Sequence, residues 1–280
     1  MKKTLLTILA HPDDESFGMG GTLAKYSAEG VDVHICIATD GAAGSVAEGH
    51  EDARADLVAV RTVELDKAIA ILGGTLHKLN YRDSGYINDP ANQHPEAFIN
   101  VDTDEAVGRI VKLIRDLKPD VVVTHDETGG YFHPDHIRCW EITTKAFAVV
   151  NDANAYPEAG EPFQPSRLYF TAFSNSWLKM YTRIIRLRGG DPTAQGRNKD
   201  IDMTRLGIEK EKLHATVDYR NYWDVQVKAS AAHASQGGGS GGPFRVIPKF
   251  LRKRFFAKNS FIRAYPPVQD GFQEDGLFPL

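Results

Sequence analysis

The feature of the sequence that most constrains its fold is the alternation of short apolar runs with longer segments of helical period. Such alternation is typical of parallel strands joined by crossover helices. Each run is short and too apolar to have one face in water, so we expect the strands to lie centrally in a sheet. The expected strands are Thr4 to Ala10, Val31 to Ala38, Thr75 to Leu79 and Asp120 to His125. The sequence therefore predicts an α/β fold with a Rossmann-like, mostly parallel open sheet and helices on both faces.

The segments between the strands supply the expected helices. They are Gly18 to Ala28, Asp52 to Leu72 and Asp104 to Leu117, and Gly73-Gly74 ends the second of them. We divide the chain into a core, residues 1–150, and a smaller C-terminal region, residues 151–280, that completes the same domain. In that region we expect a loop over residues 151–165, a strand from Leu168 to Phe173 and a helix from Tyr219 to Gln236.

A glycine-rich stretch and a basic stretch stand near the end of the chain. Gly237 to Gly242 predicts a flexible surface loop. The following residues, Pro243 to Arg263, contain several Lys and Arg and no acid, interleaved with Phe250, Phe255 and Phe256. We expect an amphipathic packing helix with a solvated basic face. The alternative is a site for an anionic substrate group or partner.

Charge and cysteine content exclude several classes of protein. Lys and Arg number 33 against 37 Asp and Glu, a net charge of −4, which offers no general attraction to nucleic acid or to an anionic membrane. No apolar run approaches the roughly 20 residues of a membrane helix. Cys36 and Cys139 are far apart in the sequence and form no C-x-x-C pair, which favours a reducing, cytoplasmic compartment. A homo-oligomer stays possible.

The first motif with chemical potential is Ala10-His11-Pro12-Asp13-Asp14-Glu15, at the end of the first strand. In open α/β sheets ligands bind at the carboxyl edge, where such strands end. One imidazole with adjacent carboxylates can hold zinc and leave a spare carboxylate to act as a base. The alternative is that Asp13 or Asp14 only caps the following helix.

The second motif is the segment Gly129-Gly130-Tyr131-Phe132-His133-Pro134-Asp135-His136. It follows the strand that ends at His125, so its histidines fall on the same edge of the sheet as the first motif. Two strand ends then supply one cluster of ligands. The alternative is a loop whose two histidines are exposed by chance.

The two motifs together, A-H-P-D-D-E and G-G-Y-x-H-P-D-H, resemble those of the LmbE-like (PIG-L) family of zinc N-deacetylases. Further matches run through most of the chain: Arg61 and Glu64 in an R-x-x-E pattern, Arg82-Asp83-Ser84-Gly85, and Lys228 with His233-Ala234-Ser235-Gln236. Two departures stand beside the expected pocket: Phe132 replaces a frequent Gly, and His125-Asp126-Glu127-Thr128 replaces a more usual Asp-Pro. They bear on the substrate more than on the chemistry.

The resemblance implies roles for individual residues. It implies one Zn²⁺ per chain, or another divalent metal, held by His11, Asp14 and His136, which makes residues 1–150 a metal-binding catalytic core. It further implies Asp13 as the general base, His133 as the electrostatic catalyst, Asp135 as the carboxylate that orients His133, and Tyr131 as a mobile tyrosine beside the substrate. Substrate binding falls to Arg61, Asp83, Glu64 and His233, although His233 is as compatible with packing as with substrate contact.

The implied function is that of a zinc-dependent hydrolase that removes the N-acetyl group of an N-acetylglucosamine-containing small molecule, by metal-activated water with Asp13 as general base. One alternative is an amidase of the same family that acts on a larger amino-sugar thiol conjugate. Another is a non-catalytic, zinc-containing sugar-binding protein, which would not need Asp13. The expected partner is therefore a small amino-sugar molecule, with no nucleic acid and no membrane.

Overall fold

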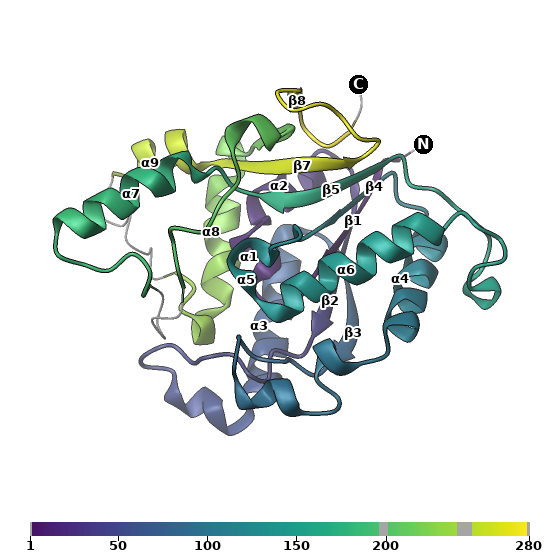
Figure 1. Ribbon diagram of the computed structural model, residues 1–280, viewed down its shortest axis with the longest axis horizontal. Helices are drawn as coiled ribbons and strands as arrows, with labels where there is room; N and C mark the ends of the chain where they lie inside the picture. The colour runs from purple at the N-terminus through teal and green to yellow at the C-terminus, as the bar shows by residue number, and fades with distance from the viewer. Residues whose placement is uncertain (1, 196–200, 240–247, 279–280) are drawn as a thin grey trace.

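The protein is built around an eight-stranded sheet, which the computed structural model describes over residues 2–195, 201–239 and 248–278. The strands lie in the order β3-β2-β1-β4-β5-β7-β6-β8 (Figure 1). All neighbouring pairs are parallel except those of β7, which runs antiparallel to both β5 and β6. The strands are β1 Thr4–Leu9, β2 Asp32–Thr39, β3 Thr75–Tyr81, β4 Val121–Thr124, β5 Arg167–Ala172, β6 Ala215–Asp218, β7 Lys258–Tyr265 and β8 Glu274–Asp275. The predicted mostly parallel α/β sheet is confirmed.

Helices cover both faces of this sheet, as predicted, because alternate residues of each central strand point to opposite sides. In β1, Leu5 and Leu9 pack with α2, α3 and α8, while Leu6 and Ile8 pack with α4 and α6. The helices are α1 Asp14–Phe17, α2 Gly20–Ala28, α3 Leu57–Leu72, α4 Thr103–Leu117, α5 Gly129–Phe132, α6 Pro134–Val149, α7 Asn175–Leu187, α8 Trp223–Ala232 and α9 Lys249–Phe256. None of the helices described is long and apolar enough to cross a membrane.

One expected central strand, β3, is an edge strand instead. It pairs with β2 alone among the strands described, and Thr75, Lys78 and Asn80 are not buried. Three of the five residues from Thr75 to Leu79 are polar, so the run is less apolar than the prediction of a central strand requires. The expected loop after α6 is confirmed apart from a short 3-10 turn, Pro157–Ala159.

The basic segment is not one helix, contrary to the prediction. Its first five residues lie outside the described ranges, α9 follows, and the chain then turns at the buried Ala257 into β7. The central part of β7 lies in the interior of the sheet, where Phe261 is fully buried. Arg263 in this strand forms an ion pair of 3.2 Å with Glu274, which comes from outside the segment. The predicted glycine loop falls partly outside the described residues.

The division at residue 150 remains a prediction, and the sheet crosses it. Strands β5 to β8 come from the second part of the chain and extend the sheet formed by the first part. The carboxyl ends of β1 and β4 are neighbours in this sheet, because Ile8 is in register with Thr124. The two histidine-containing motifs therefore leave the sheet side by side.

Candidate active site

Three ligand atoms converge where β1 and β4 end. The Nδ1 atom of His11 lies 3.1 Å from Nε2 of His136 and 3.7 Å from Oδ2 of Asp14, and these last two atoms are 3.3 Å apart. Zinc ligands at the corners of a tetrahedron lie about 3.3 Å from one another, given bond lengths of about 2.0–2.2 Å. The donor set and its spacing therefore fit one metal ion, with a coordination position left over.

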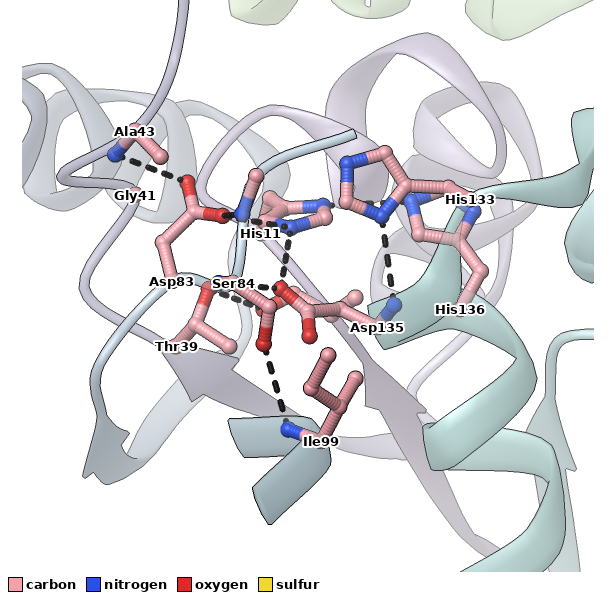
Figure 2. Close-up of polar contacts among 12 residues, drawn as sticks. His11, Thr39, Gly41, Ala43, Asp83, Ser84, Ile99, His133, Asp135 and His136 are labelled. Atoms are coloured by element: carbon pink, nitrogen blue, oxygen red, sulfur yellow. Dashed lines mark hydrogen bonds and ion pairs between the residues drawn. The ribbon is translucent and has the colours of Figure 1, made fainter. Parts of the chain in front are cut away.

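Both histidines are held by their second ring nitrogen, as metal-binding histidines usually are. His11 directs Nε2 at Oδ2 of Asp135, 3.2 Å away, and His136 directs Nδ1 at the carbonyl oxygen of Gly129, 3.1 Å away. Figure 2 shows Asp135 between His11 and the backbone N–H of Ser84, which also donates to its carboxylate at 3.0 Å. Each imidazole thus presents its other nitrogen to the centre of the cluster.

The contact of Asp135 with His11 differs from the role predicted for it. The carboxylate was expected to orient His133, yet His133 is fixed by the backbone of Asp135, whose N–H donates to Nδ1 at 3.2 Å (Figure 2). His133 is the residue before α6, and its ring caps the helix in this way. The carboxylate is free to turn towards β1 because the first turn of α6 already has a cap.

The charge around the cluster favours a cation at its centre. Burial alone would lower the pKa of His11, but the carboxylates of Asp83, Asp135 and Asp14 outweigh burial and raise that pKa well above its ordinary value. Burial lowers the pKa of His136 and keeps its imidazole neutral, which a metal ligand must be. Positive charge in this cluster can come from a proton on His11 or from a metal ion. The cluster is therefore able to hold a metal ion.

His125 is part of this cluster and was not among the predicted site residues. Its ring stacks on that of His136 with 3.9 Å between centroids, and its Nε2 atom accepts the N–H of Ala10 at 3.2 Å. The same atom lies 3.6 Å from Oδ2 of Asp14. The signal that could have identified His125 is its place as the residue directly after β4, on the edge that carries the site.

Asp13 has an unusual backbone conformation that keeps it apart from the three ligand atoms. Its φ is +122°, a value that side-chain-bearing residues rarely adopt. Two contacts stabilise it: the Asp13 N–H donates to Oε2 of Glu15 at 2.9 Å, and Arg61 donates to Oδ2 of Asp13 at 3.2 Å. Burial raises the pKa of Asp13 to about 7, against the opposing attraction of Arg61. Such a carboxylate is suited to exchange protons near neutral pH.

Arg61 lines the cavity but directs most of its guanidinium at protein groups. It donates to the carbonyl oxygens of Pro12 and Gly41, in addition to Asp13. Gly41 has a φ of +70°, and a Cβ there would lie 2.6 Å from the guanidinium, so the turn needs glycine to approach this closely. Arg61 therefore supports Asp13, and the predicted contact of Arg61 with a sugar hydroxyl would be an additional interaction.

Two predicted substrate residues, Glu64 and His233, do not line the cavity. Glu64 accepts hydrogen bonds from the backbone N–H and the hydroxyl of Ser235, both at 2.7 Å. His233 is fully buried and directs Nε2 at Oε1 of Glu15, 2.6 Å away. Glu64 therefore ties the segment after α8 to α3, and His233 ties it to the first motif. Their contact with substrate stays a prediction.

A cavity of about 340 Å³ opens over the cluster. Besides Arg61, the predicted residues on its wall are His11, Asp13, Asp83, Tyr131 and His133. Sequence reasoning missed Tyr86, whose hydroxyl donates to the carbonyl oxygen of Tyr131 at 3.0 Å, and also Asp89 and Gln236. Tyr86 follows the Arg82 to Gly85 motif directly and Asp89 lies four residues after it, so the extension of that motif was the available signal.

Two groups on the cavity wall have well-defined protonation states. Burial and the neighbouring His11 lower the pKa of His133 to about 3, so its imidazole is neutral and not protonated as a cationic catalyst would be. Because Nδ1 of His133 accepts the Asp135 N–H, its proton sits on Nε2, which can donate. Asp83 stays ionised: burial opposes this, but His11 and the N–H of Gly85 hold its pKa well below the usual range.

Comparison with known proteins gives relatives that are similar over most of the chain. A deacetylase of Rhodococcus erythropolis, 1D-myo-inositol 2-acetamido-2-deoxy-alpha-D-glucopyranoside deacetylase, is 38% identical over 252 residues, which cover 84% of this chain and 81% of the relative. A mycothiol S-conjugate amidase of Streptomyces coelicolor is 34% identical over 287 residues, with 98% and 96% of the two chains covered.

Solved structures share the fold at lower identity. N,N'-diacetylchitobiose deacetylase from Pyrococcus horikoshii matches with a TM-score of 0.63 at 24% identity, covering 93% of this chain and 83% of that one. GalB, the 4-carboxy-2-hydroxymuconate hydratase from Pseudomonas putida, matches with a TM-score of 0.64 at 16% identity, with 96% and 98% covered. A deacetylase and a hydratase thus share this architecture, so activity has to be argued from the site.

The family model described as PIG-L, GlcNAc-PI de-N-acetylase, matches residues 6–147, a range that holds both histidine-containing motifs and every ligand atom of the cluster. Together with the relatives above, this match shows that the chain belongs to the PIG-L family.

Proposed function

We propose that the protein is a zinc-dependent N-deacetylase that hydrolyses the acetamide of a small molecule containing N-acetylglucosamine. The observation that carries the proposal is the convergence of His11, Asp14 and His136 on one point beneath a cavity whose wall includes Asp13. A zinc ion held by these three residues supplies a Lewis acid that acidifies water and polarises the amide carbonyl.

Asp13 is the proposed general base. Its pKa of about 7 leaves a substantial fraction of its carboxylate able to accept a proton at neutral pH. It takes a proton from the attacking water, the oxygen of that water bonds to the amide carbon, and the carbon–nitrogen bond then breaks. The proton returns from Asp13 to the leaving nitrogen, so acetate and a free amine are released and Asp13 is regenerated.

His133 is the proposed hydrogen-bond donor to the oxygen that becomes negative during attack. It lines the cavity, and the Asp135 N–H fixes its Nδ1 atom as an acceptor, which leaves Nε2–H as the donor. A fixed neutral donor of this kind contributes about a hundred- to thousandfold to turnover. Tyr131 packs with its ring 5.8 Å from that of His133 and restricts the space on the substrate side.

The cavity wall suits a neutral, hydroxyl-rich substrate. Asp83 and Asp89 offer carboxylate acceptors for sugar hydroxyls, and Gln236 offers both a donor and an acceptor. The deacetylase of Rhodococcus erythropolis is named for an N-acetylglucosamine joined to inositol, a neutral polyol of this kind. We therefore place a GlcNAc-inositol conjugate first among the candidate substrates.

A substrate panel tests the proposal. Purified protein reloaded with zinc is incubated with N-acetylglucosamine, its inositol glycoside, N,N'-diacetylchitobiose and the mycothiol conjugate of a thiol reagent, and release of free amine is followed. Amine release from the inositol glycoside that ceases with a chelator and returns with zinc is the expected result. Amine release that persists in the metal-free protein would refute the proposal.

An amidase function is the second candidate, because the relative named mycothiol S-conjugate amidase is similar over nearly the whole chain. The same residues would perform the reaction, with the cavity holding a larger acyl group. Preferred cleavage of the mycothiol conjugate in the panel would select this function. We also propose action in the cytoplasm, which suits the two free, buried thiols of Cys36 and Cys139.

A further inference from the structure

A second cavity, also of about 340 Å³, lies between α7 and the segment 203–207. Helix α7 is the teal helix at the left of Figure 1, at one side of the sheet. Among the residues that the structure describes, the wall of the cavity carries four cationic side chains and no acidic one: Lys179, Arg183 and Arg186 from α7, and Arg205 from the facing segment. This cavity is distinct from the one over the histidine cluster and shares no residue with it.

The three cations of α7 lie on one face of the helix. They are spaced four and three residues apart, positions that stack on successive turns. Like charges at this spacing repel one another, and none of the three forms an ion pair within the part of the chain that the structure describes. The basic helix α9 differs, because its Lys249 is paired with Asp224 at 2.7 Å.

Arg205 lines the cavity from the segment that faces α7 and contacts an aromatic ring. Its guanidinium carbon lies 4.5 Å from the centre of the Phe132 ring, a cation–π contact. The backbone around it is constrained as well, because Gly207 has a φ of +81° and a Cβ there would lie 2.9 Å from the backbone of Asn175. Arg205 therefore lines the cavity from a segment whose backbone is held close to the start of α7.

We propose that this cavity binds a soluble small molecule that carries a phosphate or pyrophosphate group. A phosphomonoester has a charge of about −1.5 to −2 at pH 7 and three strong acceptor oxygens, which suits a cavity with four cations better than a single carboxylate does. The planar fork of an arginine matches phosphate oxygens two at a time. Thr182 and Thr204 also lie on the wall, but their hydroxyl groups already donate to the Lys179 carbonyl oxygen and to Oδ1 of Asp202, so the cations carry the recognition.

A soluble ligand is favoured over a lipid headgroup because the cations border a cavity of limited volume. Leu178 and Leu206 close its apolar side. Recognition of an anionic membrane instead uses basic residues spread over a surface that can lie flat on the bilayer. The proposal is independent of the proposed deacetylation, since it rests on a different set of residues.

Isothermal titration of the full-length protein with inorganic pyrophosphate, at constant ionic strength, is the direct test. The double substitution Arg183→Gln with Arg205→Gln removes one cation from each wall. Because a hydrogen bond to a charged group contributes enough to change affinity about tenfold, binding by this variant should weaken at least about tenfold. A rise of Tm with pyrophosphate in the wild type, absent in the variant, is a second readout of the same binding.

The matched control is the double substitution Arg188→Gln with Lys210→Gln. It removes the same charge from the same two stretches of chain, but neither residue lines the cavity and both are exposed. Wild-type affinity for pyrophosphate in the control variant supports a defined site. Equal weakening in both double variants overturns the proposal, because it would show general charge attraction. Absence of pyrophosphate binding by the wild type also overturns it.

A vesicle arm separates the two sources of phosphate. Wild type and both variants are sedimented with phosphatidylcholine vesicles that contain a minor fraction of phosphatidic acid. The proposal expects the protein to stay in the supernatant. Sedimentation that depends on Arg183 and Arg205, without binding of free pyrophosphate, would overturn the proposal by assigning the cavity to a lipid headgroup.

Discussion

Glu15 and His233 are 218 residues apart in the sequence and form a 2.6 Å hydrogen bond in the interior of the protein. The other carboxylate oxygen of Glu15 accepts the N–H of Asp13 at 2.9 Å. The end of α8 is thereby connected through one side chain to the proposed base, whose backbone needs support because of its positive φ. His233, which was predicted to contact substrate, thus supports the backbone of Asp13 through Glu15.

Replacement of His233 by Ala should destabilise the protein strongly. The variant breaks a fully buried His–Glu pair, and removal of one partner of such a pair costs about 3–5 kcal/mol of unfolding free energy. Burial lowers the pKa of His233 but Glu15 outweighs it and raises that pKa, so the stabilisation is complete below 6.5 and is lost as pH rises through the raised value. Urea unfolding across this range measures it.

The double variant Glu15→Gln with His233→Ala provides the control for this pair. If the two side chains interact, the double variant loses less stability than the sum of the two single losses. Strictly additive losses would show that the pair is not coupled.

The adjacent aspartates of the first motif should respond differently to the same change. Asp13→Asn keeps the size of the side chain and removes the base, so turnover should fall by about a hundred- to ten-thousandfold while the metal content stays near that of the wild type. Asp14→Asn should instead release the metal, because it removes one of the three converging ligand atoms. Metal analysis beside the amine-release assay separates the two effects, and equal metal loss in both variants would contradict the assigned roles.

Asp135→Asn should weaken metal binding although Asp135 is not a proposed ligand. Its carboxylate holds Nε2 of His11 at 3.2 Å, and removal of such a partner lowers metal affinity about ten- to a hundredfold. Competition with a chromogenic chelator gives the affinity. The exposed Asp116→Asn serves as the control. Unchanged metal affinity in Asp135→Asn would show that the Asp135 carboxylate does not support metal binding.

The pH profile of kcat/KM should show an acid limb set by Asp13. Burial raises the pKa of this carboxyl from 3.8 to about 7, and a bound cation lowers it, so the limb should fall between these values. Activity is lost as pH falls through the limb, because a protonated Asp13 cannot accept a proton. Arg61→Gln removes an attraction that lowers the pKa and should shift the limb upwards. A limb at the same pH in both proteins would argue against Asp13 as the base.

Much of the fold could be predicted because the central strands are continuous apolar runs. The position of a strand within the sheet could not be predicted. A run as short as Thr75 to Leu79, with Leu76 and Leu79 among polar residues, does not show whether one strand or two will pair with it. Strand β7 was missed for a related reason: Lys258 and Arg263 give it a basic composition, and the burial of Phe261 depends on partners far away in the sequence.

The candidate site was predictable to the extent that it lies at two strand ends. His11, Asp14 and His136 converge because neighbouring parallel strands end at one edge. The hydrogen-bond partners of individual side chains were not predictable. The sequence does not show that His133 is fixed by the backbone of Asp135, which leaves the carboxylate for His11, nor that burial keeps His133 neutral.

The late position of β7 in the chain has a consequence for synthesis on the ribosome. Strand β6 is connected to the older strands of the sheet through β7, which is made some forty residues later. Strands β1 to β5 can all pair with one another by the time residue 172 has emerged, whereas β5 gains its second neighbour, and β6 its link to the sheet, only with residues 258–265. The nascent chain therefore carries its metal-binding motifs long before β6 joins the sheet. Because His233, which braces Asp13 through Glu15, follows β6, competence for catalysis should arise only after residues 258–265 have emerged.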